Sequence, residues 1–375
     1  MKSVYIGLMS GTSLDGVDAL LADFDFPGSA LRVLGHVHRP LPPPLRDELL
    51  ALNLAGPNEL HRAALAANAL SRSYAAAIDE LLQITQKTSA DVVALGAHGQ
   101  TVRHRPTEFD GTGYTLQLLN GSLLAELTRI DVICDFRSRD LAAGGQGAPL
   151  VPGFHQAVFH QPGLPQAVLN VGGISNITWL DGDIGIAGFD CGPGNAMMDL
   201  WNQRHLNQAF DDQGAWAATG HVHQELLLQF LSEPFLAQSP PKSTGRDLFN
   251  APWLERAIQA TSTASGPLSA ADVQATLLEL TAEAAAQAVR SLPTQVKRLL
   301  VCGGGALNTQ LMRRLTVLLP ATLVASTELA GLPPMQVEAA AFAWLARQFI
   351  HRKVSSLSSV TGADGPRVLG ASYPA

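Results

Sequence analysis

The segment between Val4 and Asp23 places the strongest constraint on the fold of this chain. An apolar run ends there in a turn of Gly, Ser and Thr, and a second apolar run follows. Because Gly permits the positive φ that hairpin turns need, the pattern predicts two strands joined by a tight turn. Small hydroxyl residues in such a turn leave backbone N–H groups available to an anion, and Asp15 and Asp18 suit a divalent cation. The turn therefore predicts a phosphate site.

A similar order of elements returns in the second half of the chain. Apolar runs predict strands at 5–9, 17–24, 31–38, 91–95 and 131–134, and again at 167–171, 177–180, 184–189, 298–302 and 321–325. Helical periodicity predicts helices at 46–54, 59–82, 119–127, 196–204, 270–291 and 336–349. The recurrence of strand, Gly turn and strand predicts an α/β fold with a duplicated architecture and a cleft between its halves.

The length of 375 residues predicts two domains, since single cores rarely exceed about 250–300 residues. We place the boundary so that the domains comprise residues 1–134 and 135–375. Residues from about 206 to 263 fit neither half of the repeat and predict a mostly helical insertion in the second domain.

Composition narrows the classes of partner. The net charge of −7 and the lack of any run of Lys and Arg argue against nucleic acid as the main partner. No apolar run approaches 18 residues and the N-terminus lacks a secretory apolar region, so we expect a cytoplasmic protein without a membrane span. Cys134, Cys191 and Cys302 are too scattered for a disulfide framework and are expected to be reduced core thiols.

Three Gly turns follow apolar strands, at 7–16, 172–176 and 303–306. Neither a P-loop nor a dinucleotide-binding fingerprint occurs. Each turn alone is ordinary, since Gly is the default turn residue. Three of them at strand ends favour a nucleotide, because α/β sheets bind ligands there. The last precedes a helix, which would let adenosine or phosphate approach the backbone closely.

Asp190 is the best candidate for acid–base chemistry. It ends an apolar strand and precedes the rigid turn Gly192-Pro193-Gly194-Asn195, which would fix a carboxylate at the mouth of a cleft. The start of the following helix offers backbone N–H groups beside it. An Asp in this position is equally expected to cap that helix, so both roles stay open.

A dense group of charges ahead of a Gly-rich loop contains Arg137. Its planar fork suits a carboxylate or phosphate, and a carboxylated small-molecule ligand is favoured over a solvated linker. His98, Gln100 and His104 are candidates for further polar groups of the same site. A zinc site on the two His residues lacks an evident third ligand.

Two other features have structural explanations beside functional ones. Glu338 lies in an apolar helix and is either a charge near the positive end of the helix dipole or a ligand group. His36 and His38 are expected at polar surface positions.

Several long motifs are spread over essentially the whole chain. They are Gly7-Leu-Met-Ser-Gly-Thr-Ser-Leu-Asp-Gly16, Gly99-Gln-Thr101 with His98, Asp135-Phe-Arg137 running to Val151, Asn170-Val-Gly-Gly173 with Asn176, Gly188 to Asn195, Lys242-Ser-Thr-Gly-Arg246, and Cys302-Gly-Gly-Gly-Ala306 with Asn308. Together they resemble the anhydro-N-acetylmuramic acid kinase family.

The resemblance implies the duplicated ribonuclease-H-like fold of actin-like ATPases, sugar kinases and Hsp70. It also implies ATP-dependent opening of the 1,6-anhydro ring of anhydro-N-acetylmuramic acid with phosphorylation at O6, a step in recycling cell-wall peptidoglycan. Asp190 would be the general base that activates water for attack at the anomeric carbon. ATP and Mg²⁺ would be the cofactors, with Asp15 the candidate metal ligand.

By the same resemblance, the remaining motif residues divide between nucleotide and sugar. The nucleotide would contact Gly11, Thr12, Ser13, Leu14, Asp15, Gly16, Val17, Asp18, Gly172, Gly173, Asn176, Gly303, Gly304, Gly305 and Asn308. The sugar would contact His98, Gln100, Arg137, Gly194, Asn195 and Glu338. The lactyl carboxylate of the sugar offers a natural role for Arg137.

Other functions remain open on the residues alone. An ordinary hexose kinase of the same fold would use Asp190 to deprotonate a sugar hydroxyl. A sugar-sensing regulator lacks a helix-turn-helix segment or basic face, and the turn from Ser10 to Asp18 would be surplus to it. An Hsp70-like chaperone would need a separate peptide-binding domain. The oligomeric state is left open, with a homodimer among the possibilities.

Overall fold

The computed structural model describes residues 3–11, 14–25, 31–182 and 185–375. Its contacts divide the chain into two compact units, Met1–Val158 with Gln336–Ala375, and Phe159–Met335. This division differs from the predicted boundary after residue 134, because residues 135–158 belong to the first unit and the C-terminal end of the chain returns to it. There β13 pairs antiparallel with β7, and α12 packs against β1 and β4.

The first unit contains a sheet with the strand order β13-β7-β4-β1-β2-β3. Its strands are β1 (Val4–Met9), β2 (Gly16–Asp23), β3 (Arg32–Pro40), β4 (Val92–Ala97), β7 (Val132–Cys134) and β13 (Ala371–Tyr373), and a separate hairpin is formed by β5 (Gln100–Pro106) and β6 (Gly113–Leu118). β1, β2 and β3 form an antiparallel meander. β4 runs parallel to β1, and β7 parallel to β4.

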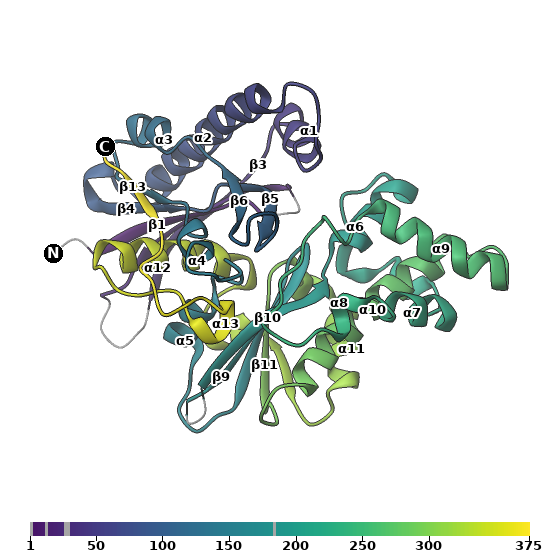
Figure 1. Ribbon diagram of the computed structural model, residues 1–375. Helices are drawn as coiled ribbons and strands as arrows, with labels where there is room; N and C mark the ends of the chain where they lie inside the picture. Colours follow the sequence, from purple (N-terminus) through teal and green to yellow (C-terminus); the bar gives the residue numbers. More distant parts are fainter. Residues whose placement is uncertain (1–2, 12–13, 26–30, 183–184) are drawn as a thin grey trace. The chain divides into compact units, whose positions relative to one another are not determined.

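Helices cover both faces of this sheet (Figure 1). The α-helices of this unit are α1 (Pro43–Ala51), α2 (Glu59–Ile84), α3 (Gly121–Thr128), α4 (Ser138–Leu141), α5 (Pro152–Phe159), α12 (Val337–Ile350) and α13 (Ser358–Thr361). Alternation along β1 directs Ile6 and Leu8 into the core shared with α2. Gly7 instead faces α12, where a Cβ would collide with the backbone carbonyl of Ala339. The sheet therefore lies between α2 on one face and α12 on the other.

The second unit repeats the strand arrangement of the first. Its sheet has the order β10-β9-β8-β11-β12, formed by β8 (Gln166–Val171), β9 (Ile174–Asp181), β10 (Gly185–Pro193), β11 (Arg298–Cys302) and β12 (Leu323–Ser326). β8, β9 and β10 form an antiparallel meander, and β11 and β12 run parallel to β8. This corresponds strand by strand to β1, β2, β3, β4 and β7. The predicted duplicated α/β fold is confirmed.

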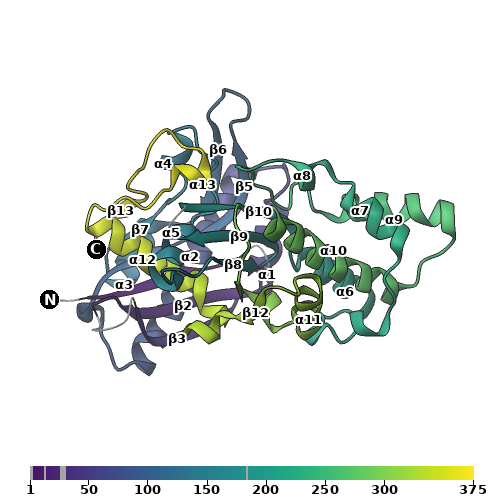
Figure 2. The same ribbon diagram turned by 90° about the horizontal axis from the view of Figure 1, so that it is seen from below.

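The second unit also contains α-helices outside its sheet (Figure 2). They are α6 (Ala196–Leu206), α7 (Gln224–Leu231), α8 (Pro234–Ala237), α9 (Ala251–Ser265), α10 (Ala270–Arg290) and α11 (Thr309–Leu318). The predicted helical insertion contains α7, α8 and most of α9, and α10 packs against α6, α7 and α11. A core cluster joins these helices to β8, β9, β10 and β11.

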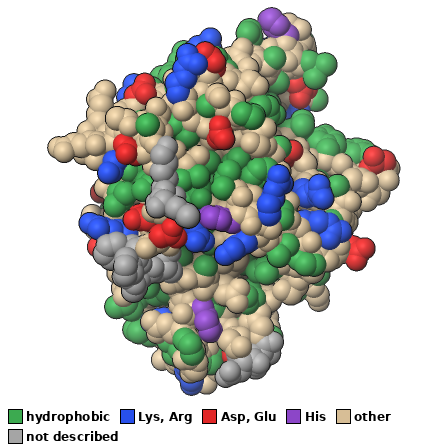
Figure 3. All heavy atoms as spheres, turned by 90° about the vertical axis from the view of Figure 1, so that its left-hand side faces the viewer, with side chains coloured by type: hydrophobic (Ala, Val, Ile, Leu, Met, Phe, Trp, Pro, Cys, Tyr) green, Lys and Arg blue, Asp and Glu red, His purple; other side chains and the backbone are tan. Residues whose placement is uncertain are grey.

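The side chains on the surface and the burial of the three cysteines agree with what the composition predicts. On the face shown in Figure 3, basic and acidic side chains are interspersed with apolar ones. Cys134, Cys191 and Cys302 are buried, as predicted. In the part of the chain that the structure describes, no helix has the length and apolar character that crossing a membrane requires.

Candidate functional site

The carboxyl ends of β1, β4 and β7 lie at one edge of the first sheet, because these strands are parallel. β1 leads into Ser10 and Gly11, β4 into His98, and β7 into the segment that contains Arg137. The backbone N–H of His98 donates to the carbonyl of Leu8 at 3.0 Å, which joins the first two of these strand ends. The fold therefore gathers three regions that the sequence singled out.

The turn after β1 is held by its own backbone and by a side chain from β5. The N–H of Leu14 donates to the carbonyl of Gly11 at 3.2 Å. The N–H of Gly16 donates to Asp15 Oδ1 at 2.9 Å. Gln100 Nε2 donates to the same Gly11 carbonyl at 3.2 Å. Gln100, predicted to bind sugar, thus also supports the predicted phosphate turn.

The predicted nucleotide contacts in this turn are not equivalent. The side chains of Leu14 and Val17 are buried in the core, so only their backbone groups are available to a ligand. Asp15 is exposed. Thr12 and Ser13 lie outside the described residues.

Asp18 makes two contacts that no local sequence pattern predicts. Its Oδ1 lies 2.9 Å from His36 Nε2 and 3.1 Å from His38 Nδ1, both on β3. Burial acts to raise the pKa of Asp18, but hydrogen bonds from the two His side chains outweigh it and lower that pKa. The Asp18 contact raises the pKa of His38. The two His residues are therefore partners of Asp18, and His38 is also exposed, as predicted.

Arg137 connects His98 to the Gly-rich loop. Its Nη1 donates to the carbonyl of Gly147 at 2.8 Å, and its Nη2 donates to His98 Nε2 at 3.0 Å. Because Nε2 accepts this bond, the proton of His98 lies on Nδ1. Burial, with a smaller effect of the Arg137 charge, lowers the pKa of His98 to about 3 and that of His104 to about 4. Both rings are therefore neutral near pH 7.

The same region contains buried polar atoms that lack partners. Within the described residues, His98 Nδ1, Gln100 Oε1 and His104 Nε2 are buried and have no hydrogen-bond partner. Such atoms are normally paired in folded proteins, so this set suits a polar ligand that both donates and accepts. Glu338, also in the first unit, is half-buried in the first turn of α12.

In the second unit, Asp190 is buried near the end of β10, with 6% of its surface exposed. Its Oδ2 accepts a hydrogen bond from the backbone N–H of Thr244 at 2.9 Å. Its own N–H donates to the carbonyl of Lys242 at 3.2 Å. The N-cap position of α6 is Asn195, so Asp190 does not have the helix-capping role that the sequence left open.

Lys242 was matched as part of a motif but was not predicted to have a role. Its Nζ donates to the carbonyls of Phe235 at 3.1 Å and Leu236 at 3.0 Å, and lies 4.8 Å from the centroid of the Phe235 ring. Burial lowers the pKa of Lys242, although Cys191 and Asp190 act to raise it. The ammonium group therefore anchors the segment that binds Asp190. The only signal for Lys242 in the sequence was its place in the motif from Lys242 to Arg246.

The first two Gly turns of the second unit bind each other. The N–H of Gly194 donates to the carbonyl of Gly173 at 2.9 Å, and the N–H of Asn195 donates to that of Gly172 at 2.8 Å. Asn195 Nδ2 donates to the carbonyl of Val171 at 3.0 Å. These groups hold the turns together, so they shape the predicted site instead of presenting these N–H groups to a ligand.

The third Gly turn lies against the same strand end. Gly303 has a φ of +74°, and a Cβ there would lie 2.6 Å from Asn170 Oδ1 and 2.7 Å from the carbonyl of Val171. Gly304 and Gly305 follow in a short 3-10 turn, and Asn308 Oδ1 then caps α11 by accepting from the N–H of Leu311 at 3.0 Å. Because of this positive φ and these close contacts, only Gly fits at position 303. The surface of the turn is therefore formed by backbone at this position.

The residues present suit Mg²⁺ bound through a nucleotide. No group of three or more His, Cys, Asp or Glu side chains placed to hold a metal occurs among residues 3–11, 14–25, 31–182 and 185–375. Mg²⁺ in kinases usually keeps several waters and takes about one or two carboxylates together with phosphates. The exposed carboxylate of Asp15, next to the predicted phosphate turn, meets that requirement.

Comparison with known proteins is consistent across the whole length. A family model described as anhydro-N-acetylmuramic acid kinase matches residues 3–375. A protein of that name from Albidiferax ferrireducens is 57% identical over 100% of both chains. Proteins of the same name from Variovorax paradoxus and Cupriavidus pinatubonensis are 58% and 55% identical, each over 99% of this chain and 99% and 98% of theirs.

Proposed function

The chain belongs to the anhydro-N-acetylmuramic acid kinase family, and we propose that it opens the 1,6-anhydro ring of anhydro-N-acetylmuramic acid at the expense of ATP. The products are N-acetylmuramic acid 6-phosphate and ADP, in the recycling of cell-wall peptidoglycan. Within the site, the proposal depends most on Asp190, a buried carboxylate held at the end of β10 by the N–H of Thr244.

The proposed reaction forms two bonds between heavy atoms, breaks two, and moves one proton. A water molecule gives a proton to the Asp190 carboxylate, and its oxygen bonds to the anomeric carbon while the bond from that carbon to O6 breaks. O6 then bonds to the γ-phosphorus of ATP, and the bond between this phosphorus and ADP breaks. An inverting glycosidase needs a base on one face and an acid at the leaving oxygen. Here the phosphoryl group replaces the proton of that acid, so one carboxylate is sufficient.

The backbone turns supply the proposed nucleotide contacts. We assign the phosphates to the turn from Gly11 to Asp18 and the approach of the nucleotide to the turns at Gly172–Gly173 and Gly303–Gly305, with Asn176 and Asn308 beside them. Asp15 would hold Mg²⁺, which neutralises phosphate charge when bound. Because ATP is the donor, we expect the reaction to take place in the cytoplasm.

The polar cluster of the first unit supplies the proposed sugar contacts. The Arg137 guanidinium suits the lactyl carboxylate. Neutral His98 offers an N–H at Nδ1, and Gln100 offers a carbonyl oxygen, for hydroxyl or amide groups of the sugar. Glu338 is the remaining sugar-binding candidate in the first unit, and Gly194 and Asn195 are the candidates in the second.

Replacing Asp190 with Asn tests the proposal. We expect ADP release with the anhydro sugar to fall by about 10²–10⁴-fold, the usual contribution of a general base. ATP affinity, measured by calorimetry, should stay close to that of the wild type and serves as the control for folding. Turnover within about ten-fold of the wild type would contradict the role of Asp190.

The same assay separates this function from that of an ordinary hexose kinase. Wild-type protein is offered the anhydro sugar, glucose and N-acetylglucosamine in parallel. Only the anhydro sugar should support rapid ADP release. Phosphorylation of glucose without turnover of the anhydro sugar would assign hexose kinase activity instead.

A further inference from the structure

Asp140 is a fully buried carboxylate that the proposed reaction does not use. It lies on α4 with 0% of its surface exposed. Its Oδ1 accepts a hydrogen bond from Thr361 Oγ1 at 2.9 Å, and its Oδ2 accepts one from the N–H of Gly147 at 2.8 Å. Burying a charge is costly unless it is hydrogen-bonded, so these two donors are what permits a carboxylate at this position.

One of those donors leads directly to the predicted sugar site. The same Gly147 whose N–H binds Asp140 accepts Arg137 Nη1 at its carbonyl, at 2.8 Å. Arg137 Nη2 in turn donates to His98 Nε2 at 3.0 Å. Contacts through two different Nη atoms fix both the position and the plane of the guanidinium group. Asp140 therefore acts on Arg137 through a single intervening residue.

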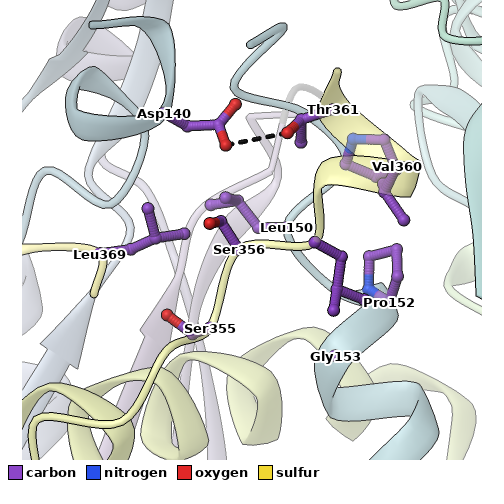
Figure 4. Close-up of a pocket in the computed structure, with 11 residues that line it drawn as sticks. Asp140, Leu150, Pro152, Gly153, Ser355, Ser356, Val360, Thr361 and Leu369 are labelled. Carbon is purple, nitrogen blue, oxygen red and sulfur yellow. Dashed lines mark hydrogen bonds between the residues drawn. The ribbon is translucent and has the colours of Figure 1, made fainter. Parts of the chain in front are cut away.

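The other donor comes from a distant part of the chain. Thr361, only 3% exposed, ends α13 and lies 221 positions beyond Asp140. Figure 4 shows the Asp140 carboxylate pointing at the Thr361 hydroxyl, above a small pocket lined by Leu150, Val360 and Leu369.

Two backbone contacts hold the C-terminal segment and the loop after Arg137 together. The N–H of Gln146 donates to the carbonyl of Thr361 at 2.8 Å, and the N–H of Asp364 donates to that of Ala143 at 2.7 Å. The loop would thus stay attached if the Thr361 hydroxyl alone were removed.

We propose that Asp140 and Thr361 are positioning residues that orient Arg137 for the carboxylate of the sugar. The inference rests on the proposed function, since it takes Arg137 to bind that carboxylate. The hydroxyl of Thr361 holds the Asp140 carboxylate in one rotamer, and that carboxylate holds the N–H of Gly147. The carbonyl of Gly147 in turn orients the Arg137 guanidinium group. A planar donor must match a carboxylate in orientation as well as distance, so a small rotation weakens binding.

The test compares Thr361→Val with Thr361→Ser. Val keeps the shape of Thr but removes the hydroxyl, whereas Ser keeps the hydroxyl. Two substrates are used: anhydro-N-acetylmuramic acid, and 1,6-anhydro-N-acetylglucosamine, which lacks the lactyl carboxylate. We expect Thr361→Val to raise KM for the first sugar about ten-fold and to leave kcat and the KM for ATP within about two-fold, because one hydrogen bond to a charged group is lost. Thr361→Ser should resemble the wild type.

The sugar without a carboxylate distinguishes a positioning role from a merely structural one. A structural defect would change KM for both sugars, whereas a positioning defect would change it only for the sugar with a carboxylate. With the sugar that lacks it, Thr361→Val and wild type should have the same KM. An equal increase for both sugars, or no increase for either, would overturn the proposal. Ser359→Ala, an exposed change in the same helix, is the matched control.

Two further arms remove ambiguity. If Thr361→Val fails to fold, Asp140→Asn is measured in the same way, since the amide keeps the shape but loses the charge and one acceptor. Again a KM increase confined to the carboxylate-bearing sugar supports the proposal, and any other pattern overturns it. Failure of wild-type protein to turn over the anhydro sugar would instead refute the proposed function itself.

Discussion

Lys242 takes no part in the proposed reaction, but of such residues its substitution should most affect the position of the Asp190 carboxylate. Replacing Lys242 with Met would leave the carbonyls of Phe235 and Leu236 without the donor that Nζ supplies and loosen the segment that carries the Thr244 N–H. We expect kcat to fall by about ten-fold or more, because losing a charged hydrogen-bond donor costs about 1.5–3 kcal/mol. Steady-state kinetics with the anhydro sugar measures the effect.

The control for this prediction is Lys297→Met, at an exposed position of the same unit. It should leave kcat unchanged. If Lys242→Met also left kcat unchanged, the segment around Thr244 would be held by other contacts, and Lys242 would have no positioning role.

At this scale the sequence was sufficient for residues whose local motif identifies them. Asp190 could be singled out because it lies between an apolar strand and a Gly-Pro-Gly turn, and Arg137 because it precedes a Gly-rich loop. The partners could not be predicted, because they come from distant positions. Thr244 lies 54 residues from Asp190, and Thr361 lies 221 residues from Asp140. No pattern within a single segment carries such pairings.

Among the elements, the pairing of β2 with β3 should depend on pH through Asp18. Because the pKa of His38 is raised on folding, its contact with Asp18 stabilises the fold at pH values below 6.5, the pKa of His38 in the unfolded chain. This contribution is lost as the pH rises through the pKa of His38 in the folded protein. Because the pKa of Asp18 is lowered on folding, its carboxylate stabilises the fold at pH values above 3.8, the pKa of Asp18 in the unfolded chain. This contribution is lost as the pH falls through the pKa of Asp18 in the folded protein. The contact therefore contributes most between these two values.

We expect Asp18→Asn to lower the free energy of unfolding by about 0.5–1 kcal/mol near pH 5.5 and by less near pH 8.5, since partly exposed ion pairs contribute little. Urea unfolding at both pH values measures this difference. Asp47→Asn, which alters an exposed ion pair with Arg46, should show no such dependence. A loss as large at the higher pH would mean that the Asp18 contacts do not require charged His38.

The packing of α12 on the first sheet depends on one glycine in each of two strands, Gly7 in β1 and Gly96 in β4. A Cβ at Gly96 of β4 would collide with the backbone carbonyl of Phe342, just as one at Gly7 would collide with that of Ala339. Gly96→Ala should therefore destabilise the protein by about 1–3 kcal/mol through overpacking. Thermal unfolding measures it, with Gly56→Ala as the control, because there a Cβ meets only the end of the Arg62 side chain.

The strands and helices predicted from apolar runs and helical periodicity are confirmed, and the elements that were missed lack such a pattern. The strands that became β1, β2, β8 and β11 and the long helices α2 and α10 lie within a few residues of their predicted positions. The hairpin of β5 and β6 was not predicted, because Arg103, His104 and Arg105 interrupt its alternation. β13 was not predicted either, since three residues at a chain end carry no recognisable period.

For the whole molecule, the domain boundary was the feature least accessible from sequence. A dense group of charges begins at residue 135, but the units depend on which segments pack together. α12 has the same apolar pattern whichever sheet it covers. Only its contacts with β1 and β4 assign it to the first unit. The duplication of the fold, by contrast, could be predicted from the repeated strand and Gly-turn pattern, which each half carries independently.

This division makes a prediction about chain truncation. A chain ending at Met335 lacks α12, which buries Val337, Phe342 and Leu345. At about 1.5–3 kcal/mol for each large side chain, the loss approaches the whole stability of a typical domain, about 5–15 kcal/mol. The second unit is contiguous and has its own core, so it should remain folded. Hydrogen exchange should show lost protection in β1 and β4 and retained protection in β8 and β11.

A chain ending at Gly370 is the matched control, because it loses only the strand that pairs with β7. Protection of β1 and β4 should survive in it, since α12 and the meander are intact. If β1 and β4 also stayed protected in the shorter chain, the α2 face alone would be enough to hold the first sheet. If β8 and β11 lost protection as well, the second unit would depend on the first, and the two units would fold as one cooperative structure.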